Sequence, residues 1–482
     1  MIFIQKDKLP TSRVYLYVFL AVLALLLLII YAPLLYNNYF IIDDFDWLFF
    51  GSHVDNRADL LAVNPGHFYD PLINVYFWLT YKLFALNPQL HYLSNIVLHS
   101  INSWLIFVLL SKFIKWRYAF LLMLLFAFQY FGAEVLFLIN SAVHALVTMW
   151  ILLSMLAIYY YSQKNSFWLL IVYVLTTLLA LITKEIAYIL PLLQLAWLFL
   201  LFKLKITDKR GKKRVLKVFW PLVIIYFIFG IFIYTVLSGG DNTLGYVFNP
   251  DILIQLKTVL LSAVSVFFYQ PSGFVWVHIL AAILLLSLWF RAPNKKSRSL
   301  WLFGLLWTLV YLIYLSFPVP TLVASLDAIT LIPRRYGYVV SVGMIFMLAG
   351  YFTNKAATIC KIGTSIILSA LIIYNIVGIH HLDKDVYQSM SEISYGITNS
   401  VPAGLADKVD IIYILDGFPW DPSNYLYEMM DVFHGIDPDN IRYIYSDKRN
   451  GLEIDKDGPS YVVLVFDYDQ NIWQVAEIAY NK

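Results

Sequence analysis

Cysteine, charged residues and internal repeats are scarce in this sequence. Cys360 is the single cysteine, so no disulfide can form within the chain. Only 13% of the 482 residues are charged. We find no repeat, no Cys/His cluster with zinc-type spacing and no glycine-rich loop that would cradle a phosphate. These absences argue against a disulfide-stabilised, zinc-dependent or ATP-driven protein.

The residues that are present are mostly apolar, since 61% are hydrophobic and 18% are aromatic. A soluble domain cannot bury that much apolar surface, so the composition predicts a mainly α-helical, polytopic membrane protein. About 11 segments are near the minimum length for a helix that crosses a bilayer. They are residues 14–35, 90–110, 118–132, 144–161, 167–182, 186–202, 218–237, 275–290, 300–317, 337–352 and 362–379.

Lysine and arginine are concentrated in alternate connections between these segments, most densely at residues 203–217. Basic loops stay in the cytoplasm, so this pattern predicts a cytoplasmic N-terminus. Lys6, Lys8 and Arg13 precede the first segment and no small-residue cleavage site follows it, so we expect a retained helix rather than a removable signal. Two more apolar segments are residues 71–86 and 252–269. If either crossed the membrane, every later loop would lie on the opposite side from the one that its basic residues indicate. We predict that both segments are juxtamembrane helices on the outer face, or re-enter there, around the loop after the first helix.

The composition changes near residue 380, beyond which acidic residues outnumber basic ones. Residues 409–418 and 460–469 have the pattern of buried strands, and residues 424–433 have that of a helix. The sequence therefore predicts two domains. Residues 1–379 form the transmembrane domain, and residues 380–482 form a small extracytoplasmic α/β domain.

Asp43 and Asp44 lie where the first apolar segment leaves the membrane. A charge is costly in hydrocarbon but not at its edge, and neighbouring carboxylates raise each other's pKa. One of the two could then act as a base, which makes this loop a candidate catalytic site. The alternative is that both are solvated at a helix end. We interpret Asp46, Asp59 and Asp70 as surface residues of the loop.

A second group of polar residues recurs at helical spacing near the predicted outer end of one helix and so shares one face. These side chains either line a substrate cavity or join neighbouring helices by hydrogen bonds. Metal ligation is a weaker alternative, because no third ligand is apparent. The residues are His91, Asn95, His99 and Asn102.

Further ionisable residues fall at the same predicted face. A cavity that holds both carboxylates and cations suggests acid/base chemistry on an anionic, lipid-linked substrate. The alternatives without a catalytic role are a local ion pair between Lys184 and Glu185, and anchoring of the arginines at lipid phosphates. The residues are Glu134, His144, Lys184, Glu185, Arg334 and Arg335.

Five segments taken in chain order resemble the signature run of the GT-C glycosyltransferases. The nearest branches are the protein O-mannosyltransferase-like enzymes and the related O-mannosyltransferases that carry tetratricopeptide repeats. The segments are DDFDWLF, DPLINVYFWLTYKLFALNPQLHYLSNIVLHSINSWL, AEV, TKEIAYILPLL and IPRRYGYVVSVGM.

The resemblance implies that a sugar passes from a polyprenyl-phosphate or dolichyl-phosphate donor to a protein or glycan acceptor on the non-cytoplasmic face. It implies that Asp43 or Asp44 is the catalytic aspartate, and that Lys184, Arg334 and Arg335 bind the donor phosphate. Fixed cations can stabilise the departing phosphate without a divalent metal, although a divalent cation stays open as a cofactor. A direct displacement would invert the anomeric carbon.

The chain also departs from these branches. It lacks a tetratricopeptide array and the lumenal sugar-binding insert, and residues around Gln129 and Tyr130 replace a His-Pro pair. The acceptor therefore stays open. Two rival functions remain, a lipid-linked sugar transporter and a non-catalytic scaffold subunit, but charges gathered at one face without repeated halves favour the enzyme. We expect an integral protein of the plasma membrane, if prokaryotic, with membrane lipid and no nucleic acid as partner.

Overall fold

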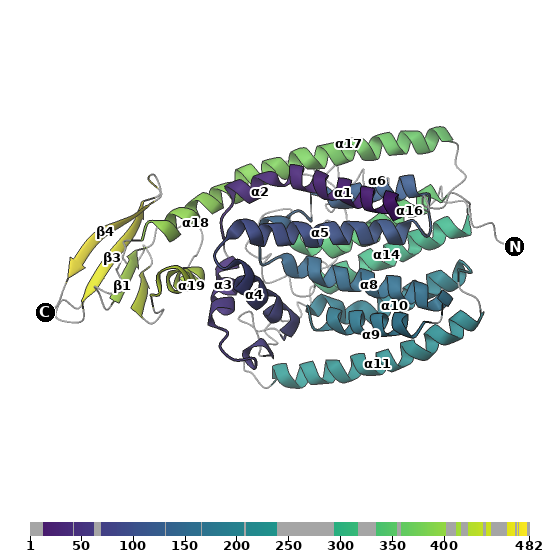
Figure 1. Ribbon diagram of the computed structural model, residues 1–482, viewed down its shortest axis with the longest axis horizontal. Helices are drawn as coiled ribbons and strands as arrows, with labels where there is room; N and C mark the ends of the chain where they lie inside the picture. Colours follow the sequence, from purple (N-terminus) through teal and green to yellow (C-terminus); the bar gives the residue numbers. More distant parts are fainter. Residues whose placement is uncertain are drawn as a thin grey trace.

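The computed structural model describes residues 13–41, 43–61, 69–130, 132–164, 166–206, 209–238, 294–316, 334–353, 358–401, 411–415, 423–436, 440–444, 460–467, 470 and 472–479. Most helices of this part run side by side in one long bundle (Figure 1). The long helices are α1 (Arg13–Ile30), α5 (Pro88–Leu110), α6 (Trp116–Ala127), α8 (Ala142–Lys164), α9 (Phe167–Leu181), α10 (Leu190–Lys203), α11 (Lys209–Ser238), α14 (Lys295–Ser316), α16 (Gly337–Phe352) and α17 (Thr358–Leu382).

Within the described residues, five helices are long and apolar enough to cross a membrane, and four shorter apolar helices accompany them. These helices make the chain a polytopic membrane protein. All nine coincide with predicted segments, and segment 218–237 falls within α11. Segment 275–290 lies outside the described residues, so the total of 11 crossings stays a prediction, as does the orientation. The five long helices are Pro88–Leu110, Ala142–Lys164, Glu185–Lys203, Lys295–Leu315 and Lys361–Leu382.

Helices α14 and α16 approach each other unusually closely, because glycines face each other where they touch. A Cβ atom built on Gly304 would lie 2.3 Å from the carbonyl oxygen of Gly343, and one on Gly343 would lie 2.6 Å from Thr308 Oγ1. Small residues at such positions let two membrane helices pack backbone to backbone. This contact fixes the place of α16, whose first turn follows the 3₁₀ helix η3 (Arg334–Tyr336).

A layer of short helices crosses one end of the bundle (Figure 1). It consists of α3 (Asp44–His53) and α4 (Pro71–Phe84), which pack through stacked rings of Trp47 and Phe77 at 4.4 Å. Pro71 begins α4, as suits a residue without an N–H at a helix start. The helix predicted over residues 71–86 is therefore present, whereas its depth in the membrane stays a prediction. The companion segment 252–269 lies outside the described residues.

Short connecting helices complete this end. A two-turn helix, α2 (Ala32–Asn37), continues α1 with only Tyr31 between them, and α7 (Glu134–Phe137) and the 3₁₀ helix η2 (Glu185–Ile189) lie between long helices. A further 3₁₀ turn, η1 (Asp59–Leu61), follows α3. The chain leaves α17 through a π-helical turn, η4 (Asp383–Gln388), into α18 (Ser389–Asn399).

The C-terminal residues form a four-stranded sheet beyond the α3 and α4 layer (Figure 1). The strand order is β2-β1-β3-β4, with β1 parallel to β2 and β3, and β4 antiparallel to β3. Helix α19 (Ser423–His434) packs on α3, where Phe433 lies 6.2 Å from Phe45 between ring centroids. The two predicted strands and the predicted helix coincide with β1, β3 and α19, whereas the domain boundary at residue 380 stays a prediction. The strands are β1 (Ile411–Leu415), β2 (Ile441–Ile444), β3 (Tyr461–Asp467) and β4 (Ile472–Ala479).

Candidate active site

Asp44 begins α3 and is only 1% exposed. Its two carboxylate oxygens accept hydrogen bonds from the backbone N–H groups of Ile41, at 3.2 Å, and Asn140, at 2.9 Å. Burial raises the pKa of Asp44 to about 7, with a smaller upward contribution from Asp43, while the two backbone hydrogen bonds oppose the shift. Asp44 thus ties the loop to the start of α8 and has little access to a substrate.

Asp43 precedes α3, and its side chain is 29% exposed. Its Oδ2 accepts a hydrogen bond from Asn140 Nδ2 at 2.8 Å and lies 3.5 Å from Arg335 Nη1. Asn140 therefore holds both members of the pair, one through its side chain and one through its backbone. Of the two predicted catalytic carboxylates, Asp43 is the more accessible.

Arg335 is held in place by its own backbone as well as by its charge. Its N–H donates to Glu134 Oε2 at 2.9 Å, and its guanidinium lies 5.9 Å from the ring centroid of Tyr336. Burial lowers the pKa of Arg335, but Glu134, Tyr336 and Asp43 outweigh it, so the pKa lies above its usual range. The group therefore stays a fixed cation. Arg334 begins η3, but its side chain lies outside the described part of the chain.

A second charged group joins Lys184, Glu185 and Asp70. Lys184 Nζ lies 3.4 Å from Glu185 Oε2. Burial and Glu185 raise the pKa of Asp70 to about 8, against the opposing effect of Lys184. Asp70 is only 3% exposed, so the interpretation of Asp70 as a surface residue is wrong. It is buried beside Lys184 and Glu185, where the backbone N–H of Leu72 also donates to the Ile182 carbonyl.

Tyr336 and His144 connect the two charged groups. Lys184 interacts electrostatically with both Tyr336 and Arg335. The His144 ring packs edge-on against Tyr336 at 4.8 Å, and its Nδ1 is buried without a hydrogen-bond partner in the described structure. The structure thus brings together Asp43 and five further residues predicted from the sequence, at the end of the bundle that carries α3. The five are Glu134, His144, Lys184, Glu185 and Arg335.

The remaining predicted side chains are occupied in contacts between helices. His91 Nε2 pairs with the Ala85 carbonyl at 3.0 Å, and Asn95 Nδ2 donates to the carbonyls of Val135 and Leu138 at 3.1 and 3.0 Å. These placements fit the alternative in which the shared face joins neighbouring helices.

His99 and Asn102 meet at a single hydroxyl. Tyr338 Oη lies 2.8 Å from His99 Nδ1 and 3.1 Å from Asn102 Nδ2. His99 Nε2 also pairs with the Ala127 carbonyl at 2.9 Å, and Asn102 Nδ2 donates to the Ala145 carbonyl at 2.7 Å. Both side chains are buried, at 2% and 0% exposure. Their hydrogen bonds connect α5 to α6, α8 and α16.

Sequence reasoning missed Asn140, which holds Asp43 and Asp44. The only signal was a polar residue between two apolar runs, and that signal does not distinguish it from Ser141 beside it. Among the described residues, no group of three or more His, Cys, Asp or Glu side chains is placed to hold a metal ion. The possibility of a divalent cation stays open.

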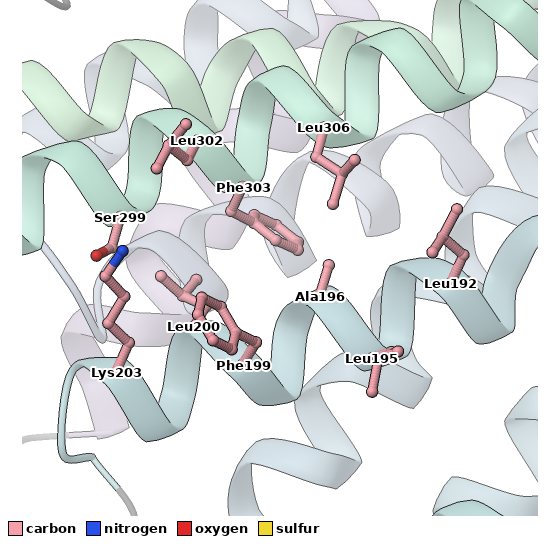
Figure 2. Close-up of a pocket in the computed structure, with 10 residues that line it drawn as sticks. All are labelled: Leu192, Leu195, Ala196, Phe199, Leu200, Lys203, Ser299, Leu302, Phe303 and Leu306. Carbon is pink, nitrogen blue, oxygen red and sulfur yellow. The ribbon is translucent and has the colours of Figure 1, made fainter.

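An apolar groove of 580 Å³ runs between α10 and α14 (Figure 2). Lys203 and Ser299 lie together at one end of it, whereas Leu192 and Leu306 lie at the other. Its exposed wall includes Phe199 at 64%. None of the predicted site residues lines the groove, and a surface of this kind suits lipid chains.

Nine chains among the solved structures match this chain in fold. The chain is similar to the crystal structure of ArnT from Cupriavidus metallidurans bound to undecaprenyl phosphate, with a TM-score of 0.49 and 12% sequence identity over 94% of this chain and 93% of that one. No family model and no curated protein sequence matches the chain.

Proposed function

We propose that this chain is a GT-C-type membrane glycosyltransferase that moves a sugar from a polyprenyl-phosphate donor to an acceptor hydroxyl. The observation that carries the proposal is the partly exposed Asp43 carboxylate beside the fixed guanidinium of Arg335. Transfer needs a base for the acceptor and a cation for the departing phosphate, and the two lie side by side here. The quoted sequence motifs favour the protein O-mannosyltransferase-like branch, with a protein or glycan as acceptor.

In the proposed reaction, Asp43 accepts the proton of the acceptor hydroxyl while that oxygen attacks the anomeric carbon. The bond from the anomeric carbon to the phosphate oxygen breaks, and its electron pair leaves with the polyprenyl phosphate. This single displacement inverts the anomeric centre. Arg335 and Lys184 offset the negative charge that develops on the phosphate. Asp44 does not touch the reacting atoms but positions Asp43 through the loop.

The proposed orientation places the α3 and α4 layer and the C-terminal sheet on the non-cytoplasmic side. Both lie at the same end of the bundle, opposite the end at which α1 begins at Arg13 (Figure 1). The basic run 203–217 includes the last residue of α10 and the first turns of α11 at the other end, where the positive-inside rule expects the cytoplasm. A polyprenyl-phosphate donor would then present its head group to Asp43 from the outer leaflet.

The test is transfer of labelled sugar in liposomes that contain a panel of polyprenyl-phosphate sugars. We expect Asp43→Asn to slow transfer by about 10²- to 10⁴-fold while donor binding survives. Asp44→Asn should lower stability more than it lowers the rate per folded molecule, and Asp59→Asn in η1 is the matched control.

Two outcomes would contradict the proposal. Passage of an intact donor across the bilayer, without transfer, would indicate a transporter. Transfer by Asp43→Asn at the wild-type rate would show that Asp43 is not the base.

A further inference from the structure

A separate pocket lies at the same end of the bundle as the candidate active site, between the end of α2, the start of α5 and α18. Its volume is 290 Å³, near the roughly 300 Å³ at which small-molecule sites begin. None of the residues assigned above to acid/base chemistry or donor binding lines it. The lining residues are Tyr36, Asn37, Asn38, Tyr39, Gln89, Ser391, Glu392 and Tyr395.

The composition of the pocket points to one chemical class of ligand. Tyr36 is 81% exposed and Tyr395 is 56% exposed, so two aromatic faces are open to solvent at the rim. Asn37, Gln89 and Glu392 are also exposed, and they supply both donors and acceptors of hydrogen bonds. A sugar ring presents an apolar C–H face bordered by hydroxyl groups, which matches aromatic rings beside amides and a carboxylate.

We propose that this pocket is a carbohydrate-binding site for neutral saccharides. Among the lining residues that the structure describes, Glu392 alone is charged, and its negative charge disfavours phosphate head groups and other anionic ligands. An aromatic belt at the membrane surface would also expose tyrosines, but it would not need the amides and carboxylate gathered around a hollow.

The wall of the pocket is well supported. The Asn38 side chain, 4% exposed, donates to Asp383 Oδ1 at 3.2 Å. The backbone carbonyl of Tyr39 accepts a hydrogen bond from Tyr92 Oη at 2.7 Å. The Tyr39 ring packs edge-on against the Tyr395 ring, with 5.3 Å between their centroids. The pocket is therefore preformed, which lowers the entropy cost of binding.

The chain links this pocket directly to the candidate base. Tyr39 precedes Asp43 by four residues, so their Cα atoms lie within about 14 Å of each other. A glycan or glycosylated acceptor bound here would extend toward the reacting carboxylate. This role as an acceptor subsite rests on the proposed transferase function, whereas saccharide binding itself does not.

The test measures binding without any donor, so that it stands apart from the transfer assay. Mannotriose, maltotriose and chitotriose are each titrated into the full-length protein in nanodiscs, by calorimetry and saturation-transfer NMR. We expect at least one to bind, and we expect Tyr36→Ala and Tyr395→Ala each to weaken its affinity about tenfold without lowering the unfolding temperature. Trp168→Ala, which removes a 73% exposed aromatic residue at the start of α9, should leave the affinity unchanged, and Asp43→Asn should also retain binding.

Three outcomes would overturn the inference. The first is that none of the three saccharides binds the wild type. The second is that both tyrosine variants bind as the wild type does. The third is that nanodiscs without the protein bind the same saccharide as strongly as nanodiscs with it. A failure of sugar transfer with saccharide binding intact would count against the transferase and leave this site standing.

Discussion

Arg335 Nη1 lies 3.5 Å from Oδ2 of Asp43, which joins the first turn of η3 to the residue that precedes α3. The carboxylate that we propose as the base is therefore held by the cation that we propose for the donor phosphate. An arriving phosphate would compete for that guanidinium and release Asp43 toward the acceptor. This relationship makes Arg335 the most informative residue to change after Asp43.

Arg335→Gln is expected to slow sugar transfer by about 10²- to 10³-fold, because it removes the fixed charge that would face the departing phosphate. Arg335→Lys should recover part of this loss, since it restores the charge without the planar fork. Single-turnover transfer in liposomes measures both. Arg57→Gln, at an exposed position after α3, is the control. Transfer at the wild-type rate by Arg335→Gln would contradict the assignment.

Asn140→Ala should slow transfer roughly tenfold to a hundredfold. It removes the 2.8 Å hydrogen bond to the Asp43 carboxylate, and a bond to a charged group contributes about 1.5–3 kcal/mol. The backbone N–H of residue 140 still donates to Asp44, so the unfolding temperature should change little. Ser141→Ala is the milder control, because Ser141 Oγ donates only to Asn140 Oδ1. A large loss of stability with no change in rate would indicate a purely structural role for Asn140.

The helices were predictable from the sequence because long apolar runs leave few alternatives in a membrane. Apolar spacing also located α4, α19 and the strands β1 and β3. It could not locate Asn140, whose contact with Asp43 spans 97 positions along the chain and depends on the fold around it. Asp70 was misjudged for the same reason, since it is buried beside Lys184 and Glu185, which lie far from it along the chain.

The polar face of α5 shows a different limit. Spacing alone correctly indicated that His91, Asn95, His99 and Asn102 share one side of a helix. It could not say whether that side meets substrate or another helix, because both need buried hydrogen-bonding groups. The partners at Ala85, Val135 and Tyr338 became visible only when the neighbouring helices were in place.

Acid should strengthen the contact between α19 and α3. Burial, and then the nearby Glu428 of α19 and the carboxylates Asp43 and Asp44, raise the pKa of Asp46 from 3.8 to about 8. The folded state therefore binds more protons than the unfolded state between about pH 4 and pH 8, so this contribution to stability declines as pH rises through that window. His53 Nε2 and Asp431 Oδ2 lie 3.5 Å apart at the same contact.

Hydrogen exchange of the α19 amides, corrected for intrinsic rates, measures this effect. Protection should fall from pH 5 to pH 8 in the wild type and fall less in Asp46→Asn. Asp59→Asn should follow the wild type. Equal slopes in the wild type and Asp46→Asn would show that Asp46 does not govern the contact.

Tyr338→Phe should destabilise the bundle by about 1–3 kcal/mol, because it strips a buried hydroxyl from both His99 Nδ1 and Asn102 Nδ2. The KM for the donor should not change if the network joins helices rather than lining a cavity. Denaturant unfolding in detergent and steady-state transfer measure the two effects. Tyr160→Phe, on a partly buried ring that contacts basic side chains, is the control. A raised KM for the donor at unchanged stability would indicate that this face of α5 lines the substrate cavity.

Gly343→Ala should both destabilise the protein and slow transfer. The new Cβ would lie 2.6 Å from Thr308 Oγ1 and 2.7 Å from the Gly304 carbonyl oxygen, so α14 and α16 must separate at a cost of about 1–3 kcal/mol. Because η3 leads directly into α16, the same displacement moves Arg335 away from Asp43. Gly363→Ala on α17 is the matched control, since no described atom beyond its chain neighbours and its own helix backbone lies within 4 Å of its added Cβ, and alanine favours a helix by roughly 0.5–1 kcal/mol. The unfolding temperature and the single-turnover transfer rate should therefore both fall in Gly343→Ala, and neither should fall in Gly363→Ala. A lower unfolding temperature in Gly343→Ala with an unchanged transfer rate would mean that the position of α16 does not set the contact between Arg335 and Asp43.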